Sequence, residues 1–353
     1  MSRKHLTTRR TFFRSVSLGA AATAWTAPPA VPAEPARRRR RQRLPREVWV
    51  ASVSQNGLEA AGQEQMIRKM LARMKEVAPL EPDIICLPEV FPFANLSTGR
   101  PPVAQVAETP IGAVCEPFAR FARDHHCYVV CPVYTRQGGE CYNAAVFIDR
   151  SGRVMGEYRK IHPTIGEMEA GVAPGPLDPP VFRTDFGVVG AQICFDIEWH
   201  DGWQRLAQAG AEIVFWPSAF AGGSMVNTKA WENHYAVVSS TRKDTTKICD
   251  VTGEEVARSG RWDKWVCAPL NLEKAFLHTW PYCNRFADIR ARYGRKVRIR
   301  TFHEEEWTIL ESRSPEVRIA DVMREFELKS HAEHIRQADL AQRARRKAPA
   351  GRS

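Results

Sequence analysis

Short apolar runs alternate along this chain with stretches of helical periodicity, and this alternation limits the fold more than any other feature. Residues 83–87 (DIICL) are almost continuously apolar, which is typical of a strand buried on both faces. Residues 62–78 instead place Met66, Met70 and Met74 on one helical face, and Pro79 ends the pattern. Strands and helices in alternation predict a layered α/β domain.

The same patterns extend over most of the chain and include two turn signals. Residues 149–152 separate the two strands of a hairpin, and Thr252-Gly253 marks a turn within 247–256. The expected strands are 48–54, 83–87, 128–134, 142–148, 154–159, 188–195, 212–216 and 236–240. The expected helices are 62–78, 113–126, 199–208, one that ends at 229–234, and a long one over 316–347.

Charge is distributed very unevenly. The 353 residues carry a net charge of +11, which taken alone would suggest a nucleic acid or an anionic membrane as partner. Residues 1–46, however, contain twelve Lys/Arg and one acidic residue, so the other 307 residues hold 39 basic and 39 acidic side chains. The body is therefore neutral, and no nucleic-acid partner is expected. With 44% hydrophobic residues the chain can bury a large core, which excludes a disordered chain and a disulfide miniprotein.

The N-terminal residues resemble a bacterial twin-arginine export signal. Arg9-Arg10 precedes a phenylalanine pair, a short apolar stretch (15–26), and then small residues and prolines. We expect a signal peptide at 1–33, with cleavage after Ala33 or Ala27, and a basic disordered linker at 34–46. This implies export to a periplasmic or extracellular location, with the twin-arginine export machinery as a partner.

No membrane-spanning segment is expected in the mature chain. The apolar part of the signal is too short, and no other stretch reaches about 18 uninterrupted apolar residues. The nine cysteines are odd in number, and several, such as Cys86 and Cys131, sit in apolar runs as small hydrophobic residues do. No paired CxxC motif or cofactor motif appears, so neither a metal nor an organic cofactor is expected.

Three reactive side chains each follow an expected strand. Glu89 comes after 83–87, Lys160 after 154–159, and Cys194 lies at the end of 188–195. Because the carboxyl ends of neighbouring strands meet at one edge of an α/β sheet, we expect the three to converge. Taken singly, each residue also has a purely structural explanation. Glu89 could cap a helix, Lys160 could be a solvent-facing strand end, and Cys194 could fill the core.

The flanking residues distinguish these explanations. LPEVF (87–91), YRKIHP (158–163) and GAQICFDIEWHDGW (190–203) together resemble the nitrilase-like carbon–nitrogen hydrolase superfamily, over about residues 47–275. The resemblance implies a four-layer α-β-β-α sandwich. It also implies that Cys194 is the nucleophile, Glu89 the general base and Lys160 the cation that stabilises the developing oxyanion.

Other site residues follow from the same resemblance. The superfamily has a second glutamate before a Pro-Gly turn, and here Glu167 and Glu169 both qualify; Glu169 is preferred because it lies nearer the turn. Phe195, Trp199 and Phe220 are candidates for substrate binding, and Asp196 for holding the cysteine loop.

Phe195 and Asp196 follow the cysteine where nitrile-hydrolysing members tend to have Trp-Glu, which favours the amidase and carbamoylase branches. The expected reaction is therefore hydrolysis of a small linear amide or N-carbamoyl compound through an acyl-cysteine, with release of ammonia or an amine. Nitrile hydrolysis, amide acyl transfer and a catalytically silent ligand-binding protein are the alternatives. The resemblance also implies a homodimer or higher oligomer, with residues 276–353, strands and a long helix, as a possible oligomer arm.

Overall fold

A computed structural model describes residues 44–109, 112–260 and 262–347. The expected signal peptide and most of the expected linker lie outside these ranges. Arg46, the last residue of the expected linker, is described and is fixed to the body. Its guanidinium pairs with Glu212 at 2.6 Å and donates to the Leu272 carbonyl, so the linker ends earlier than we expected.

The first large sheet has the strand order β12-β1-β2-β3-β4-β5. Strand β2 runs parallel to β1 and β3, whereas β12 is antiparallel to β1, and β3, β4 and β5 form an antiparallel meander. The strands are β1 (Glu47–Val53), β2 (Ile84–Cys86), β3 (Tyr128–Gln137), β4 (Glu140–Ile148), β5 (Val154–Arg159) and β12 (Trp265–Asn271).

The second large sheet has the order β11-β10-β9-β8-β7-β6, with β7, β8 and β9 parallel. Its strands are β6 (Phe182–Arg183), β7 (Val188–Ala191), β8 (Ile213–Ser218), β9 (Ala236–Thr241), β10 (Lys247–Cys249) and β11 (Glu255–Arg258). Strand β7 is shorter than the sequence suggests, because the chain turns into the 3-10 helix η3 (Cys194–Glu198) before residue 195.

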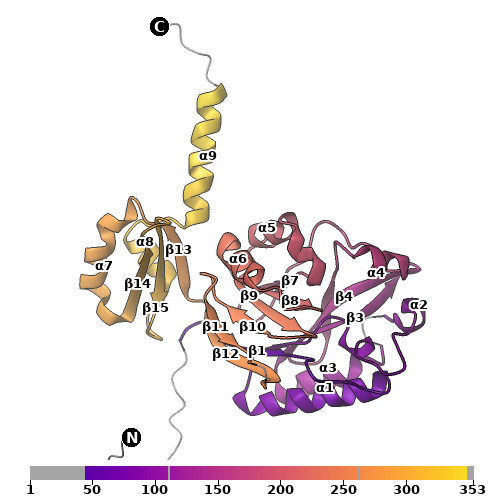
Figure 1. Cartoon of the computed structure of the whole chain (residues 1–353). Helices are drawn as coiled ribbons and strands as arrows, with labels where there is room; N and C mark the ends of the chain where they lie inside the picture. The colour runs from indigo at the N-terminus through magenta and orange to yellow at the C-terminus, as the bar shows by residue number, and fades with distance from the viewer. Residues whose placement is uncertain (1–43, 110–111, 261, 348–353) are drawn as a thin grey trace, which may run out of the picture. The chain divides into compact units, whose positions relative to one another are not determined.

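The two sheets pack face to face between two helix layers (Figure 1). Along β1 the side chains alternate: Val48 and Val50 belong to the core between the sheets, and Ala51 and Val53 to the core under the helices. Helices α1 (Gln63–Val77) and α3 (Glu116–His125) cover the first sheet, and α5 (Asp201–Gln208) and α6 (Ser224–Asn233) cover the second. The expected α-β-β-α sandwich is confirmed.

The C-terminal module, residues 274–347, has a three-stranded antiparallel sheet and its own apolar core around Leu277, Leu310 and Val322. Its elements are β13 (Lys274–His278), α7 (Phe286–Tyr293), β14 (Val297–Phe302), β15 (Trp307–Ser312), α8 (Ile319–Glu325) and α9 (His331–Lys347). The remaining short helices are η1 (Ala78–Leu80), η2 (Phe91–Phe93), α2 (Val103–Val106), α4 (Ile165–Glu169), η4 (Tyr282–Arg285) and η5 (Gly294–Lys296).

The prediction of a single long helix over 316–347 is wrong, because two helices, α8 and α9, occupy this segment. Helix α8 ends at Glu325, Glu327 has a left-handed φ of 54°, and Leu328 is buried in the core of the module. A new helix then begins after Ser330, whose hydroxyl accepts the Glu333 backbone N–H at 3.2 Å. Burial of Leu328 and capping by Ser330 therefore divide the segment in two.

Among the residues that the structure describes, no helix has both the length and the apolar content needed to cross a membrane. All nine cysteines are free thiols, and seven of them are buried.

Candidate active site

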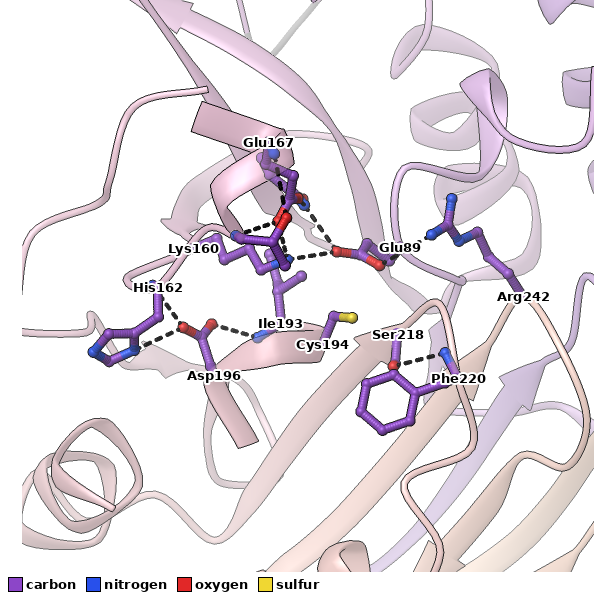
Figure 2. A network of polar contacts seen from close by, with 12 residues as sticks. Glu89, Lys160, His162, Glu167, Ile193, Cys194, Asp196, Ser218, Phe220 and Arg242 are labelled. Carbon is purple, nitrogen blue, oxygen red and sulfur yellow. Dashed lines mark hydrogen bonds and ion pairs between the residues drawn. The ribbon is translucent and has the colours of Figure 1, made fainter. Parts of the chain in front are cut away.

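Glu89, Lys160 and Cys194 meet where the two large sheets end together (Figure 2). Glu89 follows β2 and Lys160 follows β5, which are separated within the first sheet by β3 and β4, whereas Cys194 follows β7 of the second sheet. The expectation that three neighbouring strands of one sheet carry these residues is therefore wrong. They converge because the sheets face each other.

Lys160 is the centre of a buried ionic network. Its side chain is 1% exposed, and its ammonium donates to Glu89 Oε1 at 2.9 Å and to Glu167 Oε2 at 2.7 Å. The Asn143 amide donates to Oε1 of both glutamates, at 2.9 and 2.8 Å. Burial lowers the pKa of Lys160, but the charges of Glu89 and Glu167, with the hydrogen bond to Glu167, outweigh burial and raise it above its ordinary value.

Glu167, and not the preferred Glu169, is the glutamate that reaches Lys160. Thr164 caps helix α4: its hydroxyl accepts the Glu167 N–H, and its own N–H donates to Glu167 Oε2 at 2.8 Å. This orients Glu167 toward Lys160. Glu169 lies two residues further along the helix, a rotation of about 200°, and is exposed.

The other oxygen of Glu89 faces the second sheet. Its Oε2 lies 3.6 Å from Nη2 of Arg242, the residue directly after β9. Burial alone would raise the pKa of Glu89. The charges of Lys160 and Arg242, with hydrogen bonds from Lys160 and Asn143, outweigh burial and hold the pKa below its ordinary value.

Cys194 sits in a tight turn, with a left-handed φ of 47°. Asp196, fully buried, holds this turn by accepting the Ile193 N–H at 2.8 Å, the His162 N–H at 2.8 Å and the Tyr158 hydroxyl at 2.6 Å. The Trp216 indole donates to the Cys194 carbonyl at 3.0 Å. A non-glycine residue with positive φ is strained, so these bonds are what keep the thiol in place.

The resting thiol is neutral. Burial and the Glu89 charge raise the pKa of Cys194 to about 12, although Lys160, the Ala219 N–H and the Ser218 hydroxyl lower it in part. The site therefore holds a protonated thiol, an ionised carboxylate and an ammonium together. Such a set can transfer a proton from sulfur and stabilise negative charge on a nearby oxygen.

The candidate substrate-binding residues border this turn. Trp199 stacks on His162 at 4.0 Å between ring centroids, and Phe195 meets Trp199 edge-on at 5.0 Å. Phe220 packs edge-on against Trp216 at 5.3 Å. Trp199 and Phe220 remain 38% and 37% exposed, so both present apolar surface at the edge of the site.

Sequence reasoning missed Asn143 and Arg242. Asn143 interrupts an apolar run, and Arg242 follows a strand as Glu89 and Lys160 do, so both had usable signals. The Thr164 to Glu167 spacing is also a capping-box signature that could have identified Glu167. Within the described ranges, no group of three or more His, Cys, Asp or Glu side chains is placed to hold a metal ion.

Comparison with known proteins identifies the family. Residues 50–275 match the sequence profile of the carbon-nitrogen hydrolases. The chain belongs to the carbon-nitrogen hydrolase family. The match covers both large sheets and the whole ionic network.

Similar curated proteins include deaminated glutathione amidase from Mus musculus, 31% identical over 45% of this chain and 52% of that protein. Beta-ureidopropionase from Arabidopsis thaliana is 32% identical over 40% of this chain and 36% of that protein. The matches thus span about half or less of these relatives' own lengths.

Two solved structures share the fold of this chain. An amidase from Nesterenkonia sp. has a TM-score of 0.56 at 20% identity, covering 63% of this chain and 90% of that one. Saccharomyces cerevisiae Nit3, a member of branch 10 of the nitrilase superfamily, has a TM-score of 0.57 at 17% identity, covering 64% and 91%.

Proposed function

We propose that this protein hydrolyses the C–N bond of a small linear amide or N-carbamoyl compound through an acyl-Cys194 intermediate. The observation that carries the proposal is the juxtaposition of the buried Glu89–Lys160 pair with a neutral thiol in a strained turn. Similarity to a deaminated glutathione amidase and a beta-ureidopropionase supports this substrate class.

In the first half-reaction, Glu89 takes the thiol proton while Cys194 Sγ attacks the carbonyl carbon. A C–S bond forms and the carbonyl oxygen becomes an oxyanion, which the Lys160 ammonium and the Phe195 backbone N–H stabilise. The C–N bond then breaks, and the amine leaves with the proton that Glu89 received. The thioester remains on the enzyme.

In the second half-reaction, Glu89 removes a proton from water, and the resulting hydroxide attacks the thioester carbonyl. The C–S bond breaks, the carboxylic acid leaves, and the proton returns to Cys194. Glu89 thus serves twice as base and twice as acid. A lowered pKa suits the base role, because the carboxylate is ionised before each proton transfer.

The decisive experiment compares Cys194→Ala with the wild type for ammonia release from amides, carbamoyl amino acids and nitriles. We expect the variant to lose about 10³-fold or more of the activity on every substrate that the wild type accepts, because the thioester cannot form. Cys283→Ala, which removes a partly buried thiol of the C-terminal module, is the matched control. Wild-type turnover by Cys194→Ala would refute the assignment of the nucleophile.

We further propose that the enzyme is exported by the twin-arginine route. The sequence of residues 7–26 supports this. A fusion of residues 1–33 to a reporter should reach the periplasm, and replacing Arg9 and Arg10 by lysines should retain the reporter in the cytoplasm. Export of the double-lysine fusion would contradict this route.

A further inference from the structure

We propose that Arg242 is a positioning residue that keeps the Glu89 carboxylate ionised in its buried site, an inference that rests on the proposed function of Glu89 as the base. The two oxygens of Glu89 have different surroundings. Oε1 accepts hydrogen bonds from Lys160 and Asn143, both at 2.9 Å. Within the described part of the chain Oε2 accepts none, and Arg242 Nη2 lies 3.6 Å from it.

The charge balance of the site requires a second cation. Glu89 and Glu167 are both bound to the single ammonium of Lys160, at 2.9 and 2.7 Å. One lysine cannot neutralise two buried carboxylates, and an unbalanced buried charge is costly. Arg242 brings the count to two positive and two negative groups.

The other titratable groups facing Glu89 are neutral. Burial raises the pKa of Tyr134, on β3, to about 12, and the thiol of Cys194 has a pKa of about 12 as well. Among the residues that the structure describes, the charged neighbours of Glu89 are Lys160 after β5, Glu167 on α4 and Arg242 after β9. Of these, Arg242 is the charged group that the second sheet supplies.

The backbone fixes Arg242 in position. Its N–H donates to the Ser218 carbonyl at the end of β8, at 2.9 Å. The side chain of Arg242 is 19% exposed, whereas that of Glu89 is 3% exposed. Figure 2 shows Arg242 on the side of Glu89 opposite Lys160. A cation at this point favours the ionised form of a group that burial alone would neutralise.

The same arrangement suits the reaction. When Glu89 takes the proton of Cys194, negative charge moves from the carboxylate to the substrate oxygen, and the total charge of the site does not change. The two positive charges of Lys160 and Arg242 then balance the two negative charges of Glu167 and the oxyanion. The alternative role for Arg242 is to bind a carboxylate of the substrate, and loss of that role would weaken turnover only of substrates that carry a carboxylate.

The test measures Cys194 alkylation by iodoacetamide between pH 4 and 10, followed by mass spectrometry of the peptide that contains Cys194. We expect Arg242→Met to move the acid limb of this profile up by about one pH unit or more, since a nearby opposite charge lowers a carboxyl pKa by about 1–3 units. Arg242→Lys should restore most of the wild-type profile. Arg242→Gln tests the same shift if the methionine variant fails to fold.

Lys243→Met is the matched control, because it removes an equal charge from the next, exposed position and should leave the profile in place. An acid limb that stays at its wild-type pH in the folded Arg242→Met or Arg242→Gln variant would overturn the proposal.

A second comparison separates the two roles of Arg242. Butyramide and succinamate differ in that a carboxylate replaces the terminal methyl group. A positioning role predicts that Arg242→Met loses the same factor in kcat/KM on both at pH 6 and recovers on both at pH 9. A loss confined to succinamate at every pH would overturn it in favour of substrate binding. Failure of the proposed function can be told apart from failure of this inference. Turnover by Cys194→Ala would refute the proposed function, whereas the Arg242→Met results concern only the role of Arg242.

Discussion

Asn143 allows two carboxylates to share one lysine. Its side-chain amide donates one N–H to Glu89 and the other to Glu167, and it is fully buried. Two like charges so close would otherwise repel each other. The amide reduces this repulsion without adding charge, so a neutral donor is what this position requires.

We expect Asn143→Asp to destabilise the protein by about 3 kcal/mol or more at pH 7, because it adds a third carboxylate beside a single ammonium. Urea unfolding measures the loss, and the exposed Asn284→Asp is the control, with an expected change within about 0.5 kcal/mol. The difference between Asn143→Asp and wild type should narrow as the pH falls and the added carboxylate is protonated. If Asn143→Asp and Asn284→Asp were equally stable at pH 7, the proposed role of Asn143 between the two carboxylates would be contradicted.

At the scale of elements, the end of helix α6 packs against the C-terminal module through aromatic rings. His234 stacks on Phe276 at 3.8 Å and meets Trp307 and His331 edge-on at 4.9 and 4.8 Å. Trp231 lies 4.4 Å from Trp307. Burial, together with the nearby His331, lowers the pKa of His234 to about 4. The contact between body and module therefore depends on a neutral imidazole.

This contact predicts a loss of stability in mild acid. The unfolded chain protonates His234 near pH 6.5, but the folded chain resists protonation down to about pH 4, so stability falls as the pH drops through this window. His234→Phe keeps a ring that does not titrate, and its urea midpoint should fall less between pH 7 and 4.5 than that of the wild type. The exposed His303→Phe should follow the wild type. If the urea midpoint of His234→Phe fell as much between pH 7 and 4.5 as that of the wild type, the prediction would be refuted.

At the scale of the whole molecule, hydrogen bonds between the sheets align the strand ends that carry the site. Ser240 on β9 donates to the Val53 carbonyl at 2.7 Å and to the Cys86 carbonyl at 3.2 Å. Ser52 on β1 donates to the Ser239 carbonyl at 2.5 Å. Glu89 follows the strand of Cys86, and Arg242 follows the strand of Ser240. These serines thus set the position of Glu89 relative to Arg242.

The oligomeric state remains a prediction at this scale. We expect the protein to sediment as a dimer or larger oligomer at micromolar concentration. If α9 is the oligomer arm, a chain ending at Ala338 should sediment as a smaller species with the same melting temperature, because most residues beyond Ala338 in this helix are exposed. A wild-type chain that is monomeric would contradict the first expectation. A truncated chain with an unchanged sedimentation coefficient would contradict the second.

The sequence by itself determined the elements and the three reactive residues. Periodicity of two in strands and 3.6 in helices depends on local burial, so the longer strands and helices of residues 48–256 could be predicted, whereas the short α2, α4 and β6 could not. Glu89, Lys160 and Cys194 could be found because each comes within three residues of a strand end and lies within a recognisable motif.

Only the tertiary structure decided which sheet carries each residue and which neighbours complete the site. The division of the strands into two facing sheets depends on contacts far apart in the sequence, which local patterns do not encode. The same is true of Arg242, which comes from the second sheet and lies 153 positions after Glu89. Glu167 and not Glu169 reaches Lys160 because the cap at Thr164 sets the rotation of α4. Charges in a buried site are balanced in space, and the order of residues along the chain does not show that balance.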